Sequence, residues 1–342
     1  MPPATFSDHK GTLKYLPKHH MTKGLTPHRV NVFKGLEKCY VHEGRTIDPS
    51  FLEGNSIRQD LATINFDCLL DIDEPICPRF ILEFYATVDL SSDEDGEISV
   101  EFFINEHKTV LSLDKFAKIL GIPNNGTCLY TDKWPLSTLD TIEQDPSYAT
   151  PLVSQEVLRD HLFIRTSITR KNRSGSEVNK NPFGKELNEL KPQFRKWEEV
   201  LRANVISSIG NRDHVNTCLS YMLFSISTRQ PFNLAYYMAK RMADIPLNGK
   251  TALPYGMLLT RLFRAISPIP PNSRGVRLDY PLIPHTFVPL SGKRVFKTQG
   301  KRLRSPSASS SSSLMSEDDG LPNSKLAPLE YLEKLPTIKN ES

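Results

Sequence analysis

Apolar side chains recur at every second position over residues 98–104, which is the clearest strand pattern in the chain. They are Ile98, Val100, Phe102 and Ile104. A period of two is typical of a strand with one buried face. The polar residues 105–108 predict a tight turn, and residues 109–111 predict the returning strand. The pattern therefore predicts a small β-hairpin.

A helix is expected directly after the hairpin, because the apolar spacing changes there to three and four residues. The apolar positions are Leu113, Phe116, Ala117 and Leu120. Ser112 suits the N-cap, since its hydroxyl can accept a hydrogen bond from a free amide of the first turn. Gly121 permits the left-handed conformation that ends many helices, and Pro123 cannot continue one. Both ends of this helix are therefore predicted.

Helical spacing also occurs before the hairpin. The apolar positions on one helical face are Phe80, Phe84, Tyr85 and Val88. Pro78 suits the start of this helix. The acidic residues 91–97 predict a solvated loop that leads to the hairpin. Residues 194–201 predict another helix, whereas residues 158–165 are too few to separate a helix from a strand.

The longest helical block spans residues 213–266 and contains three apolar stripes. The first stripe covers residues 215–226, and the second begins after Asn233, which suits an N-cap. The third follows Pro254 and ends before Pro268. Short loops join the three, so the block predicts a compact helical subdomain.

Together these patterns predict an α+β fold that is mainly α-helical, with a small β-hairpin. The expected folded domain covers residues 58–266, with a surface loop or hinge at residues 171–186. Residues 1–57 are polar and weakly periodic, so a flexible N-terminal segment is expected there. Residues 267–342 are rich in Pro and Ser, and a disordered basic tail is expected because few apolar residues could offset the entropy cost of ordering.

Composition narrows the class of protein without identifying it. The 342 residues include 43 basic and 39 acidic ones, and a net charge of +4 is too small to indicate a partner. The scattered cysteines are Cys39, Cys68, Cys77, Cys128 and Cys218. Their spacing predicts neither a disulfide framework nor a zinc site, so buried free thiols are expected. Without a signal peptide or a transmembrane segment, an intracellular protein, nuclear or cytoplasmic, is expected.

Candidate catalytic chemistry is sparse. Asp67, Asp71 and Asp73 lie close together, and such carboxylates can hold Mg²⁺, but a loop leading to a helix N-terminus is the favoured interpretation. His161 and His214 lie near apolar stretches and are expected to be structural or surface residues. No phosphate-binding loop, nucleophile elbow or metalloprotease motif occurs. No catalytic residue, metal ligand, cofactor or small-molecule substrate is therefore predicted, and an enzyme is not favoured.

A cationic segment near the C-terminus is the main candidate binding site. Six basic residues and no acidic ones occur there: Lys293, Arg294, Lys297, Lys301, Arg302 and Arg304. Such cations can neutralise phosphates and release counterions, which gives salt-sensitive, sequence-independent nucleic-acid binding. A nuclear import signal and a merely solubilising tail remain alternatives. Phosphorylation of Ser305 or Ser307 would weaken either binding role.

Four segments together resemble the putative plant transposon protein domain, over about residues 58–266. They are ILEFYATV (81–88), LSLDKFAKILGIP (111–123), residues 214–243 and LPYGMLLTRLF (253–263). In that family an FYA-like helix precedes a strand pair, an LGIP-ended helix and a final LP-[FY] segment. Thr87 stands where the family more often has an amide side chain. The resemblance implies an origin in plant retrotransposon-derived, gag-like or transposase-like reading frames, and the family provides no catalytic residues to transfer.

The resulting expectation is a non-enzymatic, transposon-derived protein that self-associates or binds nucleic acid through its basic tail. One alternative is a degenerate transposase or nuclease remnant, which clustered carboxylates in a cleft would favour. Another is a host protein-interaction module, which a large exposed apolar groove would favour.

Overall fold

The computed structural model describes residues 25–37, 39, 41–105, 107–164, 169–171, 174–179, 185–207, 214–247 and 252–266. The expected disordered tail, residues 267–342, lies outside the described residues, and so do residues 1–24.

Helices dominate the described part, as the sequence predicts. They are α3 (Pro27–Leu36), α4 (Pro49–Leu52), α5 (Ile57–Ala62), α6 (Pro78–Thr87), α7 (Leu113–Leu120), α8 (Gln155–Leu162), α9 (Arg195–Leu201), α10 (Thr217–Thr228), α11 (Leu234–Asp244) and α12 (Gly256–Ile266). The strands are β1 (Asp89–Ser92), β2 (Ile98–Ile104), β3 (His107–Ser112), β4 (Thr169–Lys171), β5 (Glu177–Asn179), β6 (Lys185–Glu186) and β7 (His214–Val215). A π-turn, η6 (Arg202–Ile206), continues α9, and a 3-10 turn, η1 (Asp67–Leu70), precedes α6. None of the described helices is long and apolar enough to cross a membrane.

The main sheet is antiparallel, with the order β1-β2-β3. The predicted hairpin is confirmed: Ile104 pairs with His107, and Val100 pairs with Leu111. The apolar face of β2 packs on α6, where the rings of Phe84 and Phe102 are 5.1 Å apart. Strand β1 was not predicted, since the loop expected at residues 91–97 includes its last two residues. Its sequence, DLSS, lacks an alternating apolar pattern, and the pairing with β2 holds it in the sheet.

The C-terminal half of β2 extends beyond its pairing with β1, and α6 supplies hydrogen bonds there. Phe103 N–H donates to Thr87 Oγ1 (2.9 Å), and Asn105 N–H donates to Glu83 Oε2 (2.8 Å). A buried ion pair between Arg79 and Glu83 (2.8 Å) fixes that carboxylate. Thr87, which departs from the family pattern, therefore serves as an acceptor for a strand amide.

Helix α7 forms as its caps predict. The Ser112 hydroxyl accepts from Lys115 N–H (3.3 Å), and Gly121 adopts a φ of +70° at the C-terminal end. Phe116 and Leu120 are fully buried. The helix at 78–87 is likewise confirmed, and the ambiguous segment 158–165 belongs largely to α8.

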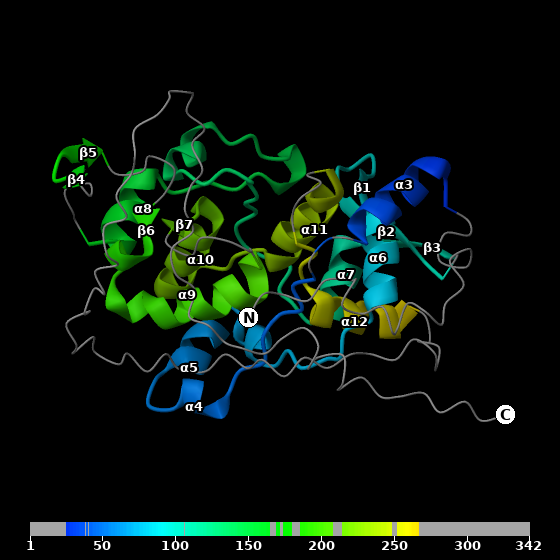
Figure 1. Cartoon of the computed structure of the whole chain (residues 1–342), viewed down its shortest axis with the longest axis horizontal. Helices are drawn as coiled ribbons and strands as arrows, with labels where there is room; N and C mark the ends of the chain where they lie inside the picture. Colours follow the sequence, from blue (N-terminus) through cyan, green and yellow to red (C-terminus); the bar gives the residue numbers. More distant parts are fainter. Residues whose placement is uncertain are drawn as a thin grey trace, which may run out of the picture.

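The three predicted helices between residues 213 and 266 are present, but they do not form a subdomain of their own. Helix α10 packs mainly on α8 and α9, whereas α11 and α12 pack on α7, and α12 also packs on α6. Figure 1 shows α10 beside α8 and α9, apart from α12. The reason is visible in α10, where every residue from Thr217 to Ile226 is buried, so this helix needs partners on all sides.

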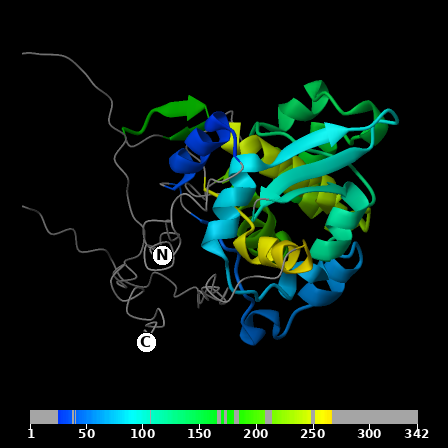
Figure 2. The same cartoon turned by 90° about the vertical axis from the view of Figure 1, so that its right-hand side faces the viewer.

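The packed fold begins well before the boundary expected at residue 58. Helix α3 packs on α6, as Figure 2 also shows. Five apolar side chains from the described residues before 58 are buried: Phe33, Leu36, Val41, Phe51 and Ile57. They are few and irregularly spaced, so the sequence pattern was too weak to indicate their burial. Within residues 171–186, the described residues include the β5 strand, which pairs with β4.

Candidate functional site

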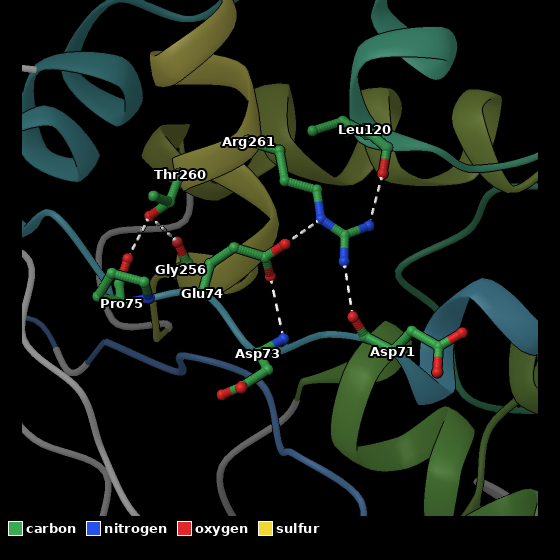
Figure 3. A network of polar contacts seen from close by, with 8 residues as sticks. All are labelled: Asp71, Asp73, Glu74, Pro75, Leu120, Gly256, Thr260 and Arg261. Carbon is green, nitrogen blue, oxygen red and sulfur yellow. Dashed lines mark hydrogen bonds and ion pairs between the residues drawn. The ribbon is translucent and has the colours of Figure 1, made fainter. Parts of the chain in front are cut away.

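Arg261 of α12 makes polar contacts with two segments that are distant in sequence (Figure 3). Its Nη1 donates to the carbonyl of Leu120 (3.0 Å), and its Nη2 donates to the carbonyl of Asp71 (2.9 Å). Its Nε forms an ion pair with Glu74. The planar guanidinium, with donors in a fixed fork, suits this three-way contact. We call these four residues the Arg261 clasp.

Neighbouring hydrogen bonds complete the Arg261 clasp. Thr260 Oγ1 donates to the carbonyl of Pro75 (2.7 Å), and Asp73 N–H donates to Glu74 Oε2 (3.1 Å), as Figure 3 shows. The segment before α6 is thereby fixed against α12. Because each nitrogen of the guanidinium bonds to a carbonyl or a carboxylate of the same chain, the Arg261 clasp acts as a structural support.

Two of the three aspartates considered for Mg²⁺ take part in these contacts through main-chain groups, Asp71 through its carbonyl and Asp73 through its N–H. The Asp71 carboxylate pairs with Arg58 (2.9 Å), and this contact lowers the pKa of Asp71. Within the described residues, no group of three or more His, Cys, Asp or Glu side chains is arranged to hold a metal ion.

Cys77, Cys128 and Cys218 are buried free thiols, as predicted, and burial raises the pKa of Cys218 to about 12.

The motifs behind the family resemblance meet in space. Leu120 of LGIP and Arg261 of LTRL are joined in the Arg261 clasp. The hydroxyl of Tyr85, from FYA, donates to the carbonyl of Pro254, from LPY (2.8 Å). Burial raises the pKa of Tyr85 well above its usual value, so this hydroxyl remains a neutral donor. The motif residues therefore hold α6, α7 and α12 together.

A second polar centre lies where residues 41–45, which we call the strap, cross the start of α12. His42 N–H donates to the carbonyl of Leu253 (2.7 Å), and Met257 N–H donates to the carbonyl of Glu43 (2.8 Å). Gly256 N–H donates to the carbonyl of His42 (3.4 Å). The strap therefore satisfies amides of the first turn of α12, which have no partner within the helix.

Asn204 of η6 fastens the other end of the strap. Its Oδ1 accepts from Arg45 N–H (2.6 Å), and its Nδ2 donates to the carbonyls of Arg45 (3.0 Å) and Leu69 (2.9 Å). Only 1% of Asn204 is exposed. One side-chain amide thus joins the strap, η1 and η6.

Sequence reasoning did not find the strap, Asn204 or Glu43. The available signal was Gly256 in the LPYGM motif, because a Cβ there would come within 3.0 Å of Ile76 Cγ2 and 3.1 Å of Glu43 Cα. A glycine in an apolar motif can indicate such a close approach of main chains. The partner in that approach is nonlocal, and the sequence does not reveal it.

The His161 and Ser227 side chains form the arrangement closest to a nucleophile and its base. His161 Nε2 contacts Ser227 Oγ, and the imidazole lies between the rings of Phe194 (5.9 Å) and Phe224 (5.1 Å). Burial lowers the pKa of His161, and the charge of Lys191 adds to this effect. Ser227 lies at the carbonyl end of α10, whose partial negative charge opposes an alkoxide. The pair therefore joins α8 to α10, consistent with the structural role expected for His161.

A polar hollow of about 300 Å³ opens near the loop after α7. It is lined by Thr131, Lys133, Thr138, Thr141, Ile142 and Glu143. Lys133, Thr141 and Glu143 are exposed, so the hollow would leave much of a ligand in water. Ligand sites normally bury most of the ligand surface, so this hollow is a weak candidate.

The sequence-predicted binding residues, Lys293 to Arg304, lie outside the described residues. In the comparisons with known proteins, no family model, no curated protein and no solved structure matches the chain. Membership of the plant transposon protein domain therefore stays a prediction that rests on the four motif segments.

Proposed function

We propose that this protein is a non-enzymatic, transposon-derived nucleic-acid-binding protein, which attaches to phosphates through residues 293–304. The observation that carries the proposal is the density of charge there, six basic residues without an acidic one. Each cation that neutralises a phosphate releases a counterion, so binding is tight at low salt and independent of base sequence.

The contacts in the folded part favour a non-enzymatic role, in which this part is a scaffold that carries the nucleic-acid-binding residues 293–304. Its most conspicuous polar groups, in the Arg261 clasp and at Asn204, bond to other parts of the same chain. Asp71, one of the three carboxylates considered for Mg²⁺, is paired with Arg58, and the described residues contain no group of three or more side chains arranged to hold a metal ion. These contacts favour the non-enzymatic scaffold over the alternative of a degenerate transposase or nuclease remnant.

A salt titration tests the proposal. The full chain and a chain truncated after Pro289 are compared on one double-stranded DNA and one single-stranded RNA. A plot of log K against log salt has a negative slope. Loss of six phosphate contacts should make this slope less steep, by about 5 for the double-stranded DNA and by about 4 for the single-stranded RNA. A full-length variant with all six basic residues changed to Ala should behave like the truncated chain.

The matched control changes two exposed lysines of α7, Lys115→Ala and Lys118→Ala. This variant should bind nearly as well as the unchanged chain, because the proposal places the contacts in residues 293–304. Equal affinities and slopes for the full and truncated chains would end the nucleic-acid proposal.

Self-association is a second candidate, favoured by the outer edge of β3. Among the described strands, β3 pairs only with β2, and Val110 near its middle is 50% exposed. An unpaired edge strand is a template for a second copy. Val110→Lys should lower the average mass in concentration-dependent sedimentation, whereas Val157→Lys on α8, where Val157 is 48% exposed, should not. A monomeric parent chain at all concentrations would remove this candidate.

A further inference from the structure

The strap carries one carboxyl group into the interior. Glu43 is only 7% exposed, and its Oε2 is enclosed without a hydrogen-bond partner among the described residues. The carbonyl of the same residue accepts the Met257 amide at the first turn of α12 (2.8 Å). The side chain and the main-chain contact that docks the strap therefore belong to one residue.

The surroundings of Glu43 do little to stabilise a negative charge. Gly256 of α12 lies close to its main chain, and the apolar side chain of Ile76, before α6, lies beside Gly256. η6 contributes Asn204, a neutral amide whose groups are bonded to Arg45 and Leu69. The strap itself contributes the charged Arg45. Burial raises the pKa of Glu43 to about 7, and a hydrogen bond from its own main-chain N–H, together with the charge of Arg45, offsets this only in part.

We propose that Glu43 is a protonation-dependent latch, which holds the strap on α12 while its carboxyl group is neutral and releases the strap when the group ionises. An ionised carboxylate with one oxygen enclosed and unbonded is less stable in such a site than in water. Release lets it reach water, and the hydrogen bonds from Gly256 and Met257 to the strap are lost with it.

The direction of the pH effect follows from where the proton is bound. In the open state the carboxyl is in water, with its ordinary pKa of 4.5, whereas in the docked state the pKa is about 7. Between these values the docked state holds the proton and the open state does not. Docking is therefore strongest below pH 4.5, weakens as pH rises toward 7, and changes little above 7.

Hydrogen exchange at the amides of Gly256 and Met257 measures the opening, since the strap caps both. After correction for the intrinsic exchange rate, the opening constant of the full chain should rise roughly twenty-fold between about pH 5.5 and about pH 7.5. Glu43→Gln, which is neutral and of the same shape, should abolish the rise. Glu53→Gln, at an exposed position of the same N-terminal region, should retain it.

Two results would overturn the latch: a flat opening constant in the unchanged chain, or the same rise in the Glu43→Gln variant. If that variant does not fold, a carbon NMR titration of the Glu43 carboxyl in the unchanged chain decides. A midpoint near 7 supports the latch, and a midpoint near the ordinary value of 4.5 contradicts it.

Discussion

At the scale of single residues, the most informative positions are those whose side chains bond to main-chain groups of distant segments. Arg261 reaches the carbonyls of Leu120 and Asp71, and Asn204 reaches both main-chain groups of Arg45. A main-chain group that loses such a partner while buried costs about 1 to 3 kcal/mol. These residues therefore determine how the helices are placed.

Replacing Arg261 tests this directly. Arg261→Ala removes two hydrogen bonds to carbonyls and leaves Glu74 unpaired. Because the pair is partly exposed, we expect a loss of about 2 kcal/mol in the free energy of unfolding, measured by urea titration. Arg261→Lys should recover only part of it, since an ammonium lacks the guanidinium fork.

Arg264, exposed three residues later on the same helix, provides the control. Arg264→Ala should change the free energy of unfolding by less than about 0.5 kcal/mol. Equal effects at the two positions would show that general helix propensity, and not the Arg261 clasp, determines the loss.

At the scale of elements, the sequence predicted those whose signals are local. Ser112, Gly121 and the four apolar positions between them define α7 within ten residues, and the structure confirms both ends. Strand β1 could not be predicted because its own sequence, DLSS, lacks an alternating apolar pattern. The strap could not be predicted because its partner, Leu253, lies far along the chain. The pairing of Leu90 with Val100 and of Val41 with Leu253 leaves no local pattern.

Two glycines should respond in opposite directions to the same substitution. Gly121 has a φ of +70° at the end of α7, so Gly121→Ala should destabilise the protein by about 1 kcal/mol. Gly35 lies in α3, and nothing within 4 Å opposes a Cβ there, so Gly35→Ala should stabilise by about 0.5 to 1 kcal/mol. Thermal and urea unfolding of both variants measures the difference. A stabilising Gly121→Ala would mean that α7 does not end in the left-handed conformation.

At the scale of the whole molecule, the fold class and most helices were predicted, but their arrangement was not. The sequence placed helix α10 in one helical block with α11 and α12, residues 213–266. In the structure α10 is buried mainly against α8 and α9. The segments quoted for the family resemblance include Leu120 and Arg261, but the sequence did not show that these two residues touch. The polar centre at the strap could not be predicted, because Glu43 and Asn204 are 161 positions apart and belong to no motif.

The N-terminal limit of the fold provides the last prediction. A chain that begins at residue 58 loses the strap and five buried side chains: Phe33, Leu36, Val41, Phe51 and Ile57. Each such side chain contributes about 1.5 to 3 kcal/mol, so the loss approaches the roughly 5 to 15 kcal/mol by which domains are stable. We therefore expect both the full chain and a chain covering residues 25–342 to unfold cooperatively on heating. A chain covering residues 58–342 should lack a cooperative transition by circular dichroism and bind a hydrophobic dye at room temperature. If both truncated chains unfold cooperatively at the same temperature, the prediction is wrong. Residues 25–57, with α3 and the strap, would then not be needed for the rest of the chain to fold.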